Sequence, residues 1–267
     1  MITTSIVTYR TNPTELSKLL DTISKSEIGK IWIIDNGMDQ SIRSVVATYP
    51  SATYIPSENI GYGRAHNIAI RQAIDNCSDI HIILNTDLSF HPDTISLLAE
   101  YMRAHPDVVA CQPRIINTDG SDQYSARLLP TPFDLFIRRF FPTWAFRHRR
   151  DKYLLKHLDR TRPFETPYLQ GSFMVLRISA LSSIGLFDER YFMYPEDIDL
   201  SRRLLSAGKV ISLPIPHVIH HHEQASYKSL RMTLVHTSNM IRYFNKWGWF
   251  FDPLRRKINR DINRQKL

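Results

Sequence analysis

Apolar and polar residues in the first half of the chain follow two patterns, one typical of buried strands and one typical of helices. Apolar or β-branched runs predict strands at residues 2–9, 30–35, 53–55, 80–84 and 108–116. Stripes that repeat with the helix period predict helices at residues 13–23, 40–49, 64–75 and 92–104. Asn12 and Pro13 supply the cap and the first-turn proline of the first helix.

Strands that alternate with helices predict an α/β fold with a mostly parallel central sheet covered by helices on both faces. Ligands of such sheets bind outside the carboxyl ends of the strands. Two polar triplets, Asp35-Asn36-Gly37 and Asn85-Thr86-Asp87, stand at those ends. We therefore expect a binding site at this edge of the sheet.

The second half of the chain is less regular. Residues 130–162 are rich in proline, arginine and aromatic residues and predict an excursion from the main fold. Ordered structure is expected to return at residues 168–177. A strand is expected at residues 210–213, helices at 179–184 and 196–207, a histidine-containing loop at 217–222 and a helix from residue 226. We expect one domain over residues 1–230 and a basic, amphipathic, aromatic-rich helical region over residues 231–267.

Composition and charge narrow the class of protein. The 267 residues are 43% apolar, 11% aromatic and 22% charged, which excludes collagen, a disulfide-stapled mini-protein and a wholly disordered chain. Of the formal charge of +8, residues 136–162 carry +7 and residues 242–267 carry +6. The remaining residues sum to −5, so an acidic body carries two basic segments.

Cysteine usage and the lack of targeting signals indicate a cytoplasmic protein. Cys77 and Cys111 have no metal-ligand or redox spacing around them, and we expect both to be buried free thiols. Residues 1–11 lack the pattern of a secretory signal. No apolar run approaches the roughly 18 residues of a membrane-spanning helix. Contact with a membrane surface stays possible.

Three polar clusters carry candidate chemistry, and each also has a purely structural explanation. Asp35-Asn36-Gly37 can form a turn, or its carboxylate can accept hydrogen bonds from a nucleobase or a ribose. Asn85-Thr86-Asp87 can form a turn, or bind a hard divalent cation shared with substrate phosphates. Glu196, Asp197 and Asp199 can cap a helix and favour its dipole. Three carboxylates beside aromatic residues exceed what a cap needs, so one of them could deprotonate a hydroxyl nucleophile.

A histidine cluster follows these carboxylates, at His217, His220, His221 and His222. It can be a solvated surface segment, or its imidazoles can bind a divalent metal or neutralise phosphate. The histidines alone favour neither interpretation.

Together, the motifs at residues 5–9, 35–37, 59–63, 67, 84–87, 171–172, 187–200 and 208 resemble those of the family 2 inverting glycosyltransferases, which have the GT-A fold. Within that family the chain is most similar to bacterial rhamnosyltransferases of O-antigen and cell-wall polysaccharide assembly. The resemblance spans roughly residues 3–230, and residues 187–200 with Gly171-Ser172 are its specific part. It implies a nucleotide-sugar donor and inversion at the anomeric carbon.

The resemblance also implies roles for the residues that match. Asp35 would hold the base of the nucleotide-sugar, with Thr8 and Arg10 nearby. Asp87 would take the Mg²⁺ or Mn²⁺ that bridges the diphosphate, and Asn85 stands where the family has another aspartate. His221 best matches a histidine that completes the metal or phosphate shell in some relatives, with His220 and His222 as alternatives. The other nucleotide-binding residues would be Asn59, Gly61, Arg64, Asn67, Asn85 and Thr86.

Asp197 matches the general base of the family, and Glu196 would orient the site or the acceptor. Gly171, Ser172 and Tyr194 would line the acceptor or sugar pocket. The implied reaction moves L-rhamnose from dTDP-rhamnose to a hydroxyl of a polyprenyl-diphosphate-linked saccharide. A UDP-hexose or UDP-N-acetylhexosamine donor, or a non-catalytic nucleotide-sugar-binding module, is the alternative. A nucleotidyltransferase is disfavoured because residues 5–11 contain no glycine-rich phosphate loop.

The two basic segments are interleaved with aromatic residues, at 133–146 and 240–262. These aromatics can pack onto the domain, lie in the headgroup region of an anionic membrane, or bind RNA. No recognisable nucleic-acid module accompanies the charge. The membrane interpretation fits a lipid-linked acceptor, so we expect a peripheral protein on the inner face of the cytoplasmic membrane.

Overall fold

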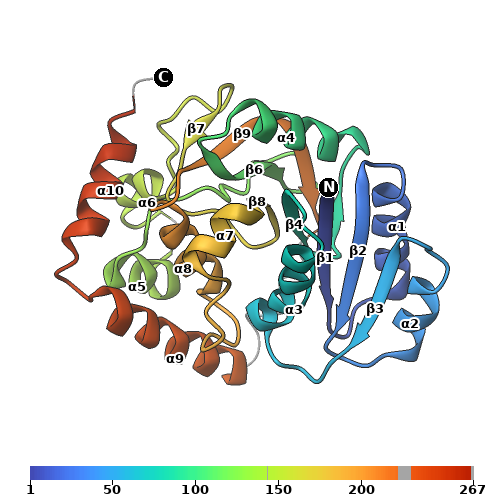
Figure 1. Cartoon of the computed structure of the whole chain (residues 1–267). Coiled ribbons are helices and arrows are strands. Elements are labelled where there is room, and N and C mark those ends of the chain that lie inside the picture. The colour runs from blue at the N-terminus through green and yellow to red at the C-terminus, as the bar shows by residue number, and fades with distance from the viewer. Residues whose placement is uncertain (143, 222–229, 266–267) are drawn as a thin grey trace.

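The structure, a computed structural model, describes residues 1–142, 144–221 and 230–265 (Figure 1). Its strands are β1 (Ile2–Thr8), β2 (Ile28–Asp35), β3 (Ala52–Pro56), β4 (Ile80–Leu84), β5 (Leu88–Ser89), β6 (Val108–Ile116), β7 (Phe164–Glu165), β8 (Phe173–Arg177) and β9 (Lys209–His220). Its helices are α1 (Pro13–Ile23), α2 (Gln40–Val46), α3 (Tyr62–Asp75), α4 (Asp93–Ala104), α5 (Pro132–Phe140), α6 (Arg147–Tyr153), α7 (Ile178–Ile184), α8 (Glu196–Leu204), α9 (Leu230–Trp247) and α10 (Pro253–Asn263). All strands and helices predicted for residues 2–116 are present, within a few residues of their expected bounds.

The strands form one sheet in the order β3-β2-β1-β4-β8-β6-β9-β5, with β7 paired to β9. β1 pairs in parallel with β2 and β4, β2 with β3, and β6 with β9. β8 runs antiparallel between β4 and β6, so these two strands point the same way. The predicted mostly parallel α/β sheet is therefore confirmed, and the carboxyl ends of β1, β2 and β4 reach one edge.

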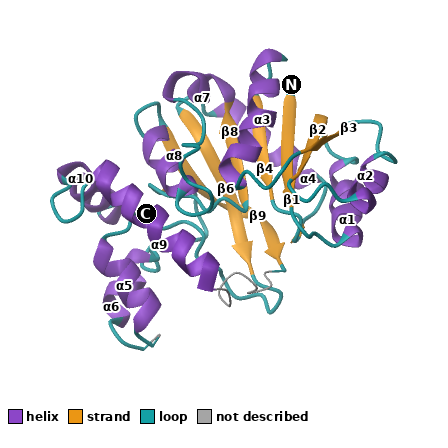
Figure 2. Cartoon of the chain, turned by 90° about the horizontal axis from the view of Figure 1, so that it is seen from below, coloured by secondary structure: helices purple, strands orange, loops and turns teal. Residues whose placement is uncertain are grey.

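Two helical layers cover the sheet because its strands are apolar on both faces. Ile31 and Ile33 of β2 point toward the core formed with α1, α2 and α4. Trp32 and Ile34 point the other way, into the core formed with α3, α7 and α8. The alternation follows from the two-residue period of a strand. Figure 2 shows the sheet between these helices.

The remaining helices, α5, α6, α9 and α10, gather on the side of the molecule away from α1 and α2 (Figures 1 and 2). A capping box between Thr131 and Asp134 starts α5. Residues Tyr243 and Phe244 of α9 are buried in a small core that also contains Leu129 and Tyr168. This core joins the C-terminal helices to the segment that precedes β8.

Two expectations from the sequence are wrong. Residues 217–220 of the expected histidine loop are instead the end of β9, because a shift of register lets β9 continue past its prolines and pair His217 with Arg114 of β6. Cys111 is a buried free thiol as expected, but Cys77 is exposed, because α3 ends at Asp75 and Cys77 lies in the turn that follows. The expected helix start at residue 226 lies outside the described residues.

Candidate active site

Asp35 ends β2 at the expected edge and is almost fully buried. Its Oδ1 accepts hydrogen bonds from Thr8 Oγ1 at 2.9 Å and from the Gly37 amide at 3.0 Å. Its Oδ2 accepts from the Asp39 amide at 2.6 Å and from the Tyr54 hydroxyl at 2.9 Å. Burial and the neighbouring Asp35 raise the pKa of Tyr54 to about 12, so Tyr54 stays a donor. Asp35 thus fixes the loop that leaves β2, and protein donors use both of its oxygens.

The other residues at the end of β1 and β2 differ in exposure. Thr8 lies buried behind Asp35. Arg10 is exposed, with a left-handed φ of 54°, and its guanidinium lies 5.3 Å from the centre of the Tyr9 ring. Asn36, which was not among the predicted site residues, donates to Gly61 O at 3.4 Å, and its buried Oδ1 has no partner within the described chain.

The segment 59–67 divides into residues that hold the fold and residues that can meet a ligand. Gly61 has a φ of 94°, and a Cβ there would lie 2.3 Å from Phe192 O, so only glycine fits. Asn67 is buried and bonds both the amide and the carbonyl of Phe187. Gly61 and Asn67 therefore hold the loop that leads into α8. Asn59 and Arg64 are exposed, and Arg64 lies 3.3 Å from Glu189.

Asp87 faces His220. The distance between Asp87 Oδ2 and His220 Nε2 is 3.1 Å, and His220 Nδ1 lies 2.9 Å from Gln123 Oε1. The His221 ring lies against Ser89 Oγ at 2.8 Å, because successive side chains at the end of β9 point to opposite sides. The structure thus favours His220 over the predicted His221 as the neighbour of Asp87, and His222 lies outside the described residues.

One carboxylate and one imidazole make a modest donor set for a metal. Among the residues described here, no group of three or more His, Cys, Asp or Glu side chains gathers as a metal site. The Asp87 side chain is 26% exposed, so a cation shared with substrate phosphates can reach it. Mg²⁺ is commonly held by one or two carboxylates together with such phosphates, so Asp87 and His220 fit this kind of site.

Tyr62 connects the Asp87 triplet to Asp197, and it was not predicted. Its hydroxyl lies 2.8 Å from Asn85 Oδ1 and 2.7 Å from Gly171 O. Burial, with nearby carboxylates, raises the pKa of Tyr62 well above its usual range, so the hydroxyl keeps its proton. Asn85 also donates its amide to Ser172 O at 2.9 Å, while Thr86 is half-buried. The feature of the sequence that could have identified Tyr62 is its position one residue after Gly61.

Glu196 and Asp197 begin α8 as two buried, adjacent carboxylates. Asp197 Oδ2 accepts from the Tyr168 hydroxyl at 3.1 Å and from the Gly171 amide at 3.0 Å, and Oδ1 accepts from the Ile198 amide at 2.8 Å. Burial raises the pKa of Asp197, while these donors and the charge of Arg127 oppose the rise. Asp197 is therefore the member of the pair that ionises more readily.

Glu196 has the opposite environment. Burial, followed by the charge of Asp197, raises the pKa of Glu196 well above its usual range. Its Oε2 has no hydrogen-bond partner in the described part of the chain. The pKa values of both carboxyls are therefore raised by burial, and the three hydrogen bonds that Asp197 accepts favour its charged form over that of Glu196.

The predicted pocket residues lie around this pair. Gly171 donates its amide to Asp197, and the Ser172 hydroxyl is buried with no partner among the described residues. Tyr194 is 37% exposed, and its ring meets that of His236 in α9 edge to face at 5.3 Å. Gly171 is therefore at the pair itself, Ser172 follows it and accepts from the Asn85 amide at its carbonyl oxygen, and Tyr194 lies toward the C-terminal helices.

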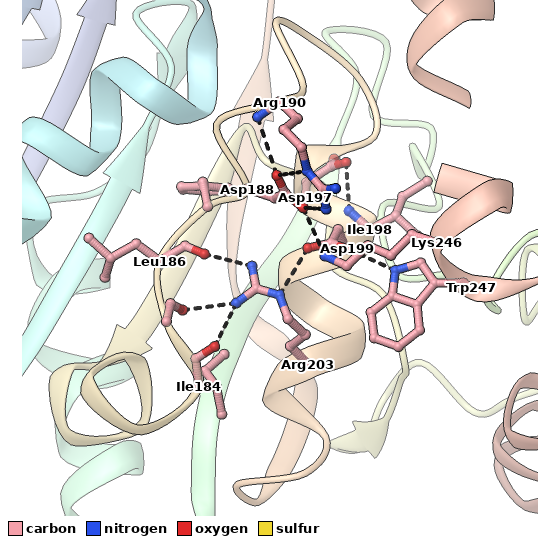
Figure 3. A network of polar contacts seen from close by, with 12 residues as sticks. Ile184, Leu186, Asp188, Arg190, Asp197, Ile198, Asp199, Arg203, Lys246 and Trp247 are labelled. Carbon is pink, nitrogen blue, oxygen red and sulfur yellow. Dashed lines mark hydrogen bonds and ion pairs between the residues drawn. The ribbon is translucent and has the colours of Figure 1, made fainter. Parts of the chain in front are cut away.

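The third carboxylate of the run, Asp199, has a structural role (Figure 3). It accepts hydrogen bonds from Arg203 Nε at 2.9 Å and from Trp247 Nε1 at 2.7 Å, and Lys246 Nζ lies 2.7 Å away. Lys246 also pairs with Asp188. Asp199 thus joins α8 to α9, and both of its oxygens are used by donors of the protein.

Known proteins that are similar to this chain are glycosyltransferases. The model of the family "Glycosyl transferase family 2" matches residues 5–185. The chain is 31% identical to the N-acetylglucosaminyl-diphospho-decaprenol L-rhamnosyltransferase of Mycobacterium tuberculosis, over 93% of this chain and 86% of that protein. It is 26% identical to the rhamnosyltransferase WbbL of Escherichia coli, over 85% of this chain and 87% of that protein.

Solved structures share the fold. GalNAc-T7 with UDP, GalNAc and Mn²⁺ superposes with a TM-score of 0.66 and 15% identity, over 92% of this chain and 48% of that one, so this chain spans about half of it. The mannosyltransferase PcManGT from Pyrobaculum calidifontis, in complex with GDP-Man and Mn²⁺, gives a TM-score of 0.58 and 16% identity, over 90% and 64% of the two chains. Both likenesses concern the fold, which is GT-A.

Proposed function

The chain belongs to glycosyl transferase family 2, and from that membership we propose that it is an inverting rhamnosyltransferase. The donor is dTDP-rhamnose, and the acceptor is a hydroxyl of a polyprenyl-diphosphate-linked saccharide in bacterial surface polysaccharide synthesis. Two rhamnosyltransferases among the relatives, one of them named for a diphospho-decaprenol substrate, support this proposal.

The observation that carries the proposed mechanism is the buried carboxylate of Asp197, which accepts three hydrogen bonds beside Glu196. Asp197 accepts the proton of the acceptor hydroxyl while the hydroxyl oxygen bonds to the anomeric carbon. The bond from that carbon to the donor diphosphate breaks on the opposite side, which inverts the configuration. Glu196, whose pKa is raised by burial and by Asp197, can donate a hydrogen bond to the incoming acceptor when it is protonated.

The leaving diphosphate needs positive charge. A divalent cation held by Asp87 and His220 would supply it, by neutralising the negative charge that develops on the leaving oxygens. The Tyr62 hydroxyl bonds both Asn85 and the Gly171 carbonyl, and it thereby links the triplet to the glycine that donates to Asp197. A non-catalytic module would have no use for a buried base with three hydrogen-bond donors, which favours an enzyme.

Asp197→Asn tests the base. The amide is nearly isosteric with the carboxylate but cannot accept the hydroxyl proton, so turnover should fall by about 10²- to 10⁴-fold. The Kd for the nucleotide-sugar, measured by calorimetry, should stay unchanged. Asp119→Asn, in an exposed turn, is the matched control. Parallel losses of donor affinity and turnover would contradict a base role. A panel of dTDP-, UDP- and GDP-sugars identifies the donor.

We further propose that the protein binds the inner face of the cytoplasmic membrane peripherally. No helix in the described ranges is long and apolar enough to span a membrane. Two aromatic groups are exposed in or beside basic segments: Phe133, Phe136, Phe141, Trp144 and Phe146 around α5 and α6, and Trp249, Phe250 and Phe251 between α9 and α10. Other aromatics of the same segments, such as Tyr243 and Phe244, belong to the core. Each exposed Lys or Arg near an anionic surface contributes about 1 kcal/mol.

A further inference from the structure

We propose that a basic cavity beside the Glu196–Asp197 pair binds the diphosphate of the lipid-linked acceptor, an inference that rests on the proposed function. The cavity has a volume of about 320 Å³ and lies between the segment after β6 and the helices α5 and α6. Its lining includes Gln123, Arg127, Asp134, Ile137, Arg149 and Arg150. None of these residues was predicted to belong to the site.

Residues on two sides of the cavity contact side chains that in turn contact Asp197 or Asp87. On one side the Arg127 amide donates to Tyr168 O at 3.2 Å, and the Arg127 guanidinium lies 6.0 Å from the centre of the Tyr168 ring. The Tyr168 hydroxyl in turn bonds Asp197. On the other side Gln123 contacts His220, which faces Asp87. A ligand in the cavity is therefore one side chain away from both halves of the proposed site.

The charge of the cavity calls for an anion. Arg149 pairs with Asp134 at 2.6 Å, whereas Arg127 and Arg150 form no ion pair with a carboxylate among the described residues. Arg127 Nε donates to Tyr124 O at 2.7 Å, and the guanidinium has no carboxylate partner in the described ranges. Arg150 uses Nη2 on the carbonyls of Ile137 and Phe141, and its buried Nε has no partner among the described residues.

Two guanidinium groups that form no ion pair with a described carboxylate match a diphosphate. Arginine binds phosphate oxygens in a bidentate, charge-assisted manner, and such contacts strengthen where solvent is partly excluded. A single carboxylate would leave one of the two arginines unpaired, whereas a diphosphate can satisfy both. The chemistry of the lining therefore indicates a polyphosphate rather than a neutral sugar.

The position of the cavity assigns this diphosphate to the acceptor rather than the donor. The diphosphate of a lipid-linked sugar lies between the sugar, whose hydroxyl must reach Asp197, and the prenyl chain. The cavity is placed in the same way. It lies between Asp197 and the exposed aromatic residues around α5 and α6, where Phe141 meets Phe136 and Phe146 edge to face. The donor diphosphate instead leaves toward Asp87.

Calorimetry with farnesyl diphosphate, a short prenyl diphosphate, tests the cavity without turnover. Arg127→Gln should weaken binding about 10- to 100-fold, since a charge-assisted contact is lost. Arg127→Lys should restore part of the affinity by restoring the charge. Arg147→Gln removes an exposed charge of α6 that does not line the cavity, and should bind like the wild type. Equal affinities of wild type and Arg127→Gln would overturn the proposal.

Transfer kinetics separate the acceptor from the donor. For Arg127→Gln, KM should rise by a similar factor for a short-chain N-acetylglucosaminyl diphospholipid, but not for the donor or for an uncharged alkyl N-acetylglucosaminide. A raised donor KM would overturn the assignment to the acceptor. Equal losses with both acceptors would also overturn it, because Arg127 would then act through Asp197. If the wild type binds farnesyl diphosphate through Arg127 but transfers no sugar, the cavity stands and the proposed function fails.

Discussion

Tyr168→Phe removes one of the three donors that keep Asp197 ionised. The hydroxyl lies 3.1 Å from Asp197 Oδ2, and both groups are buried. A hydrogen bond to a charged group contributes about 1.5–3 kcal/mol, and one pKa unit corresponds to about 1.36 kcal/mol. Because the bond stabilises the charged form, its loss should raise the pKa of Asp197 by about one to two units. The Gly171 and Ile198 amides remain as donors.

The assay is the pH dependence of kcat/KM for transfer. The acid limb reports the ionisation of the base in the free enzyme, so it should move to higher pH by about one to two units in Tyr168→Phe. Above that limb the variant should approach wild-type activity, because the carboxylate itself is unchanged. Tyr49→Phe, whose hydroxyl bonds Ser17 O and Asp21 away from the site, is the matched control. An unmoved acid limb, or the same loss at every pH, would refute this reasoning.

Three further predictions concern the metal, acid stability and the membrane. Removing divalent metal with a chelator, or Asp87→Ala, should abolish transfer, and full turnover in a metal-free assay would show that the cation is dispensable. Burial lowers the pKa of His81 to about 3, so between about pH 6.5 and 3 the unfolded chain binds a proton that the folded one excludes. The free energy of unfolding should therefore decrease as the pH is lowered through this window, by up to about 1.4 kcal/mol per pH unit. Equal free energies from urea unfolding at pH 7.5 and 5.5 would contradict this. The protein should float with vesicles that contain anionic lipid but not with neutral vesicles. Replacing Phe250 and Phe251 by serine should weaken flotation, whereas Leu97→Ser on α4 should not. An absence of flotation at low salt would contradict the membrane proposal.

Local chemistry made the first half of the fold predictable. Asn12 caps α1 as expected, since its side chain accepts from the Thr14 amide at 2.9 Å. β6 occupies 108–116, as its apolar run predicts. In these elements the local pattern and the tertiary burial agree. They disagree in β9, where Pro214 and Pro216 indicate an end that the partner strand β6 and a change of register override.

The positions of the candidate site residues could be predicted where the order and direction of the strands determine them. They could not be predicted where segments distant in the sequence meet. Asp35 and Asp87 follow strands of known direction, so their common edge could be inferred. Asn67 illustrates the limit, because its side chain is occupied by Phe187, 120 residues away. The same holds for Tyr168, whose hydroxyl meets Asp197 across 29 residues. No periodicity or spacing encodes such contacts.

The C-terminal helices support the site from behind α8. Arg202 of α8 forms two hydrogen bonds with Asp252, at 2.6 and 2.8 Å, and both side chains are at most 3% exposed. The Trp247 ring lies 4.1 Å from the same guanidinium. Removing one partner of a buried ion pair typically costs about 3–5 kcal/mol, because the other charge is left without compensation. The family match ends before α8, yet Asp197 begins this helix. The placement of the proposed base therefore depends on α9 and α10 as well as on the sheet.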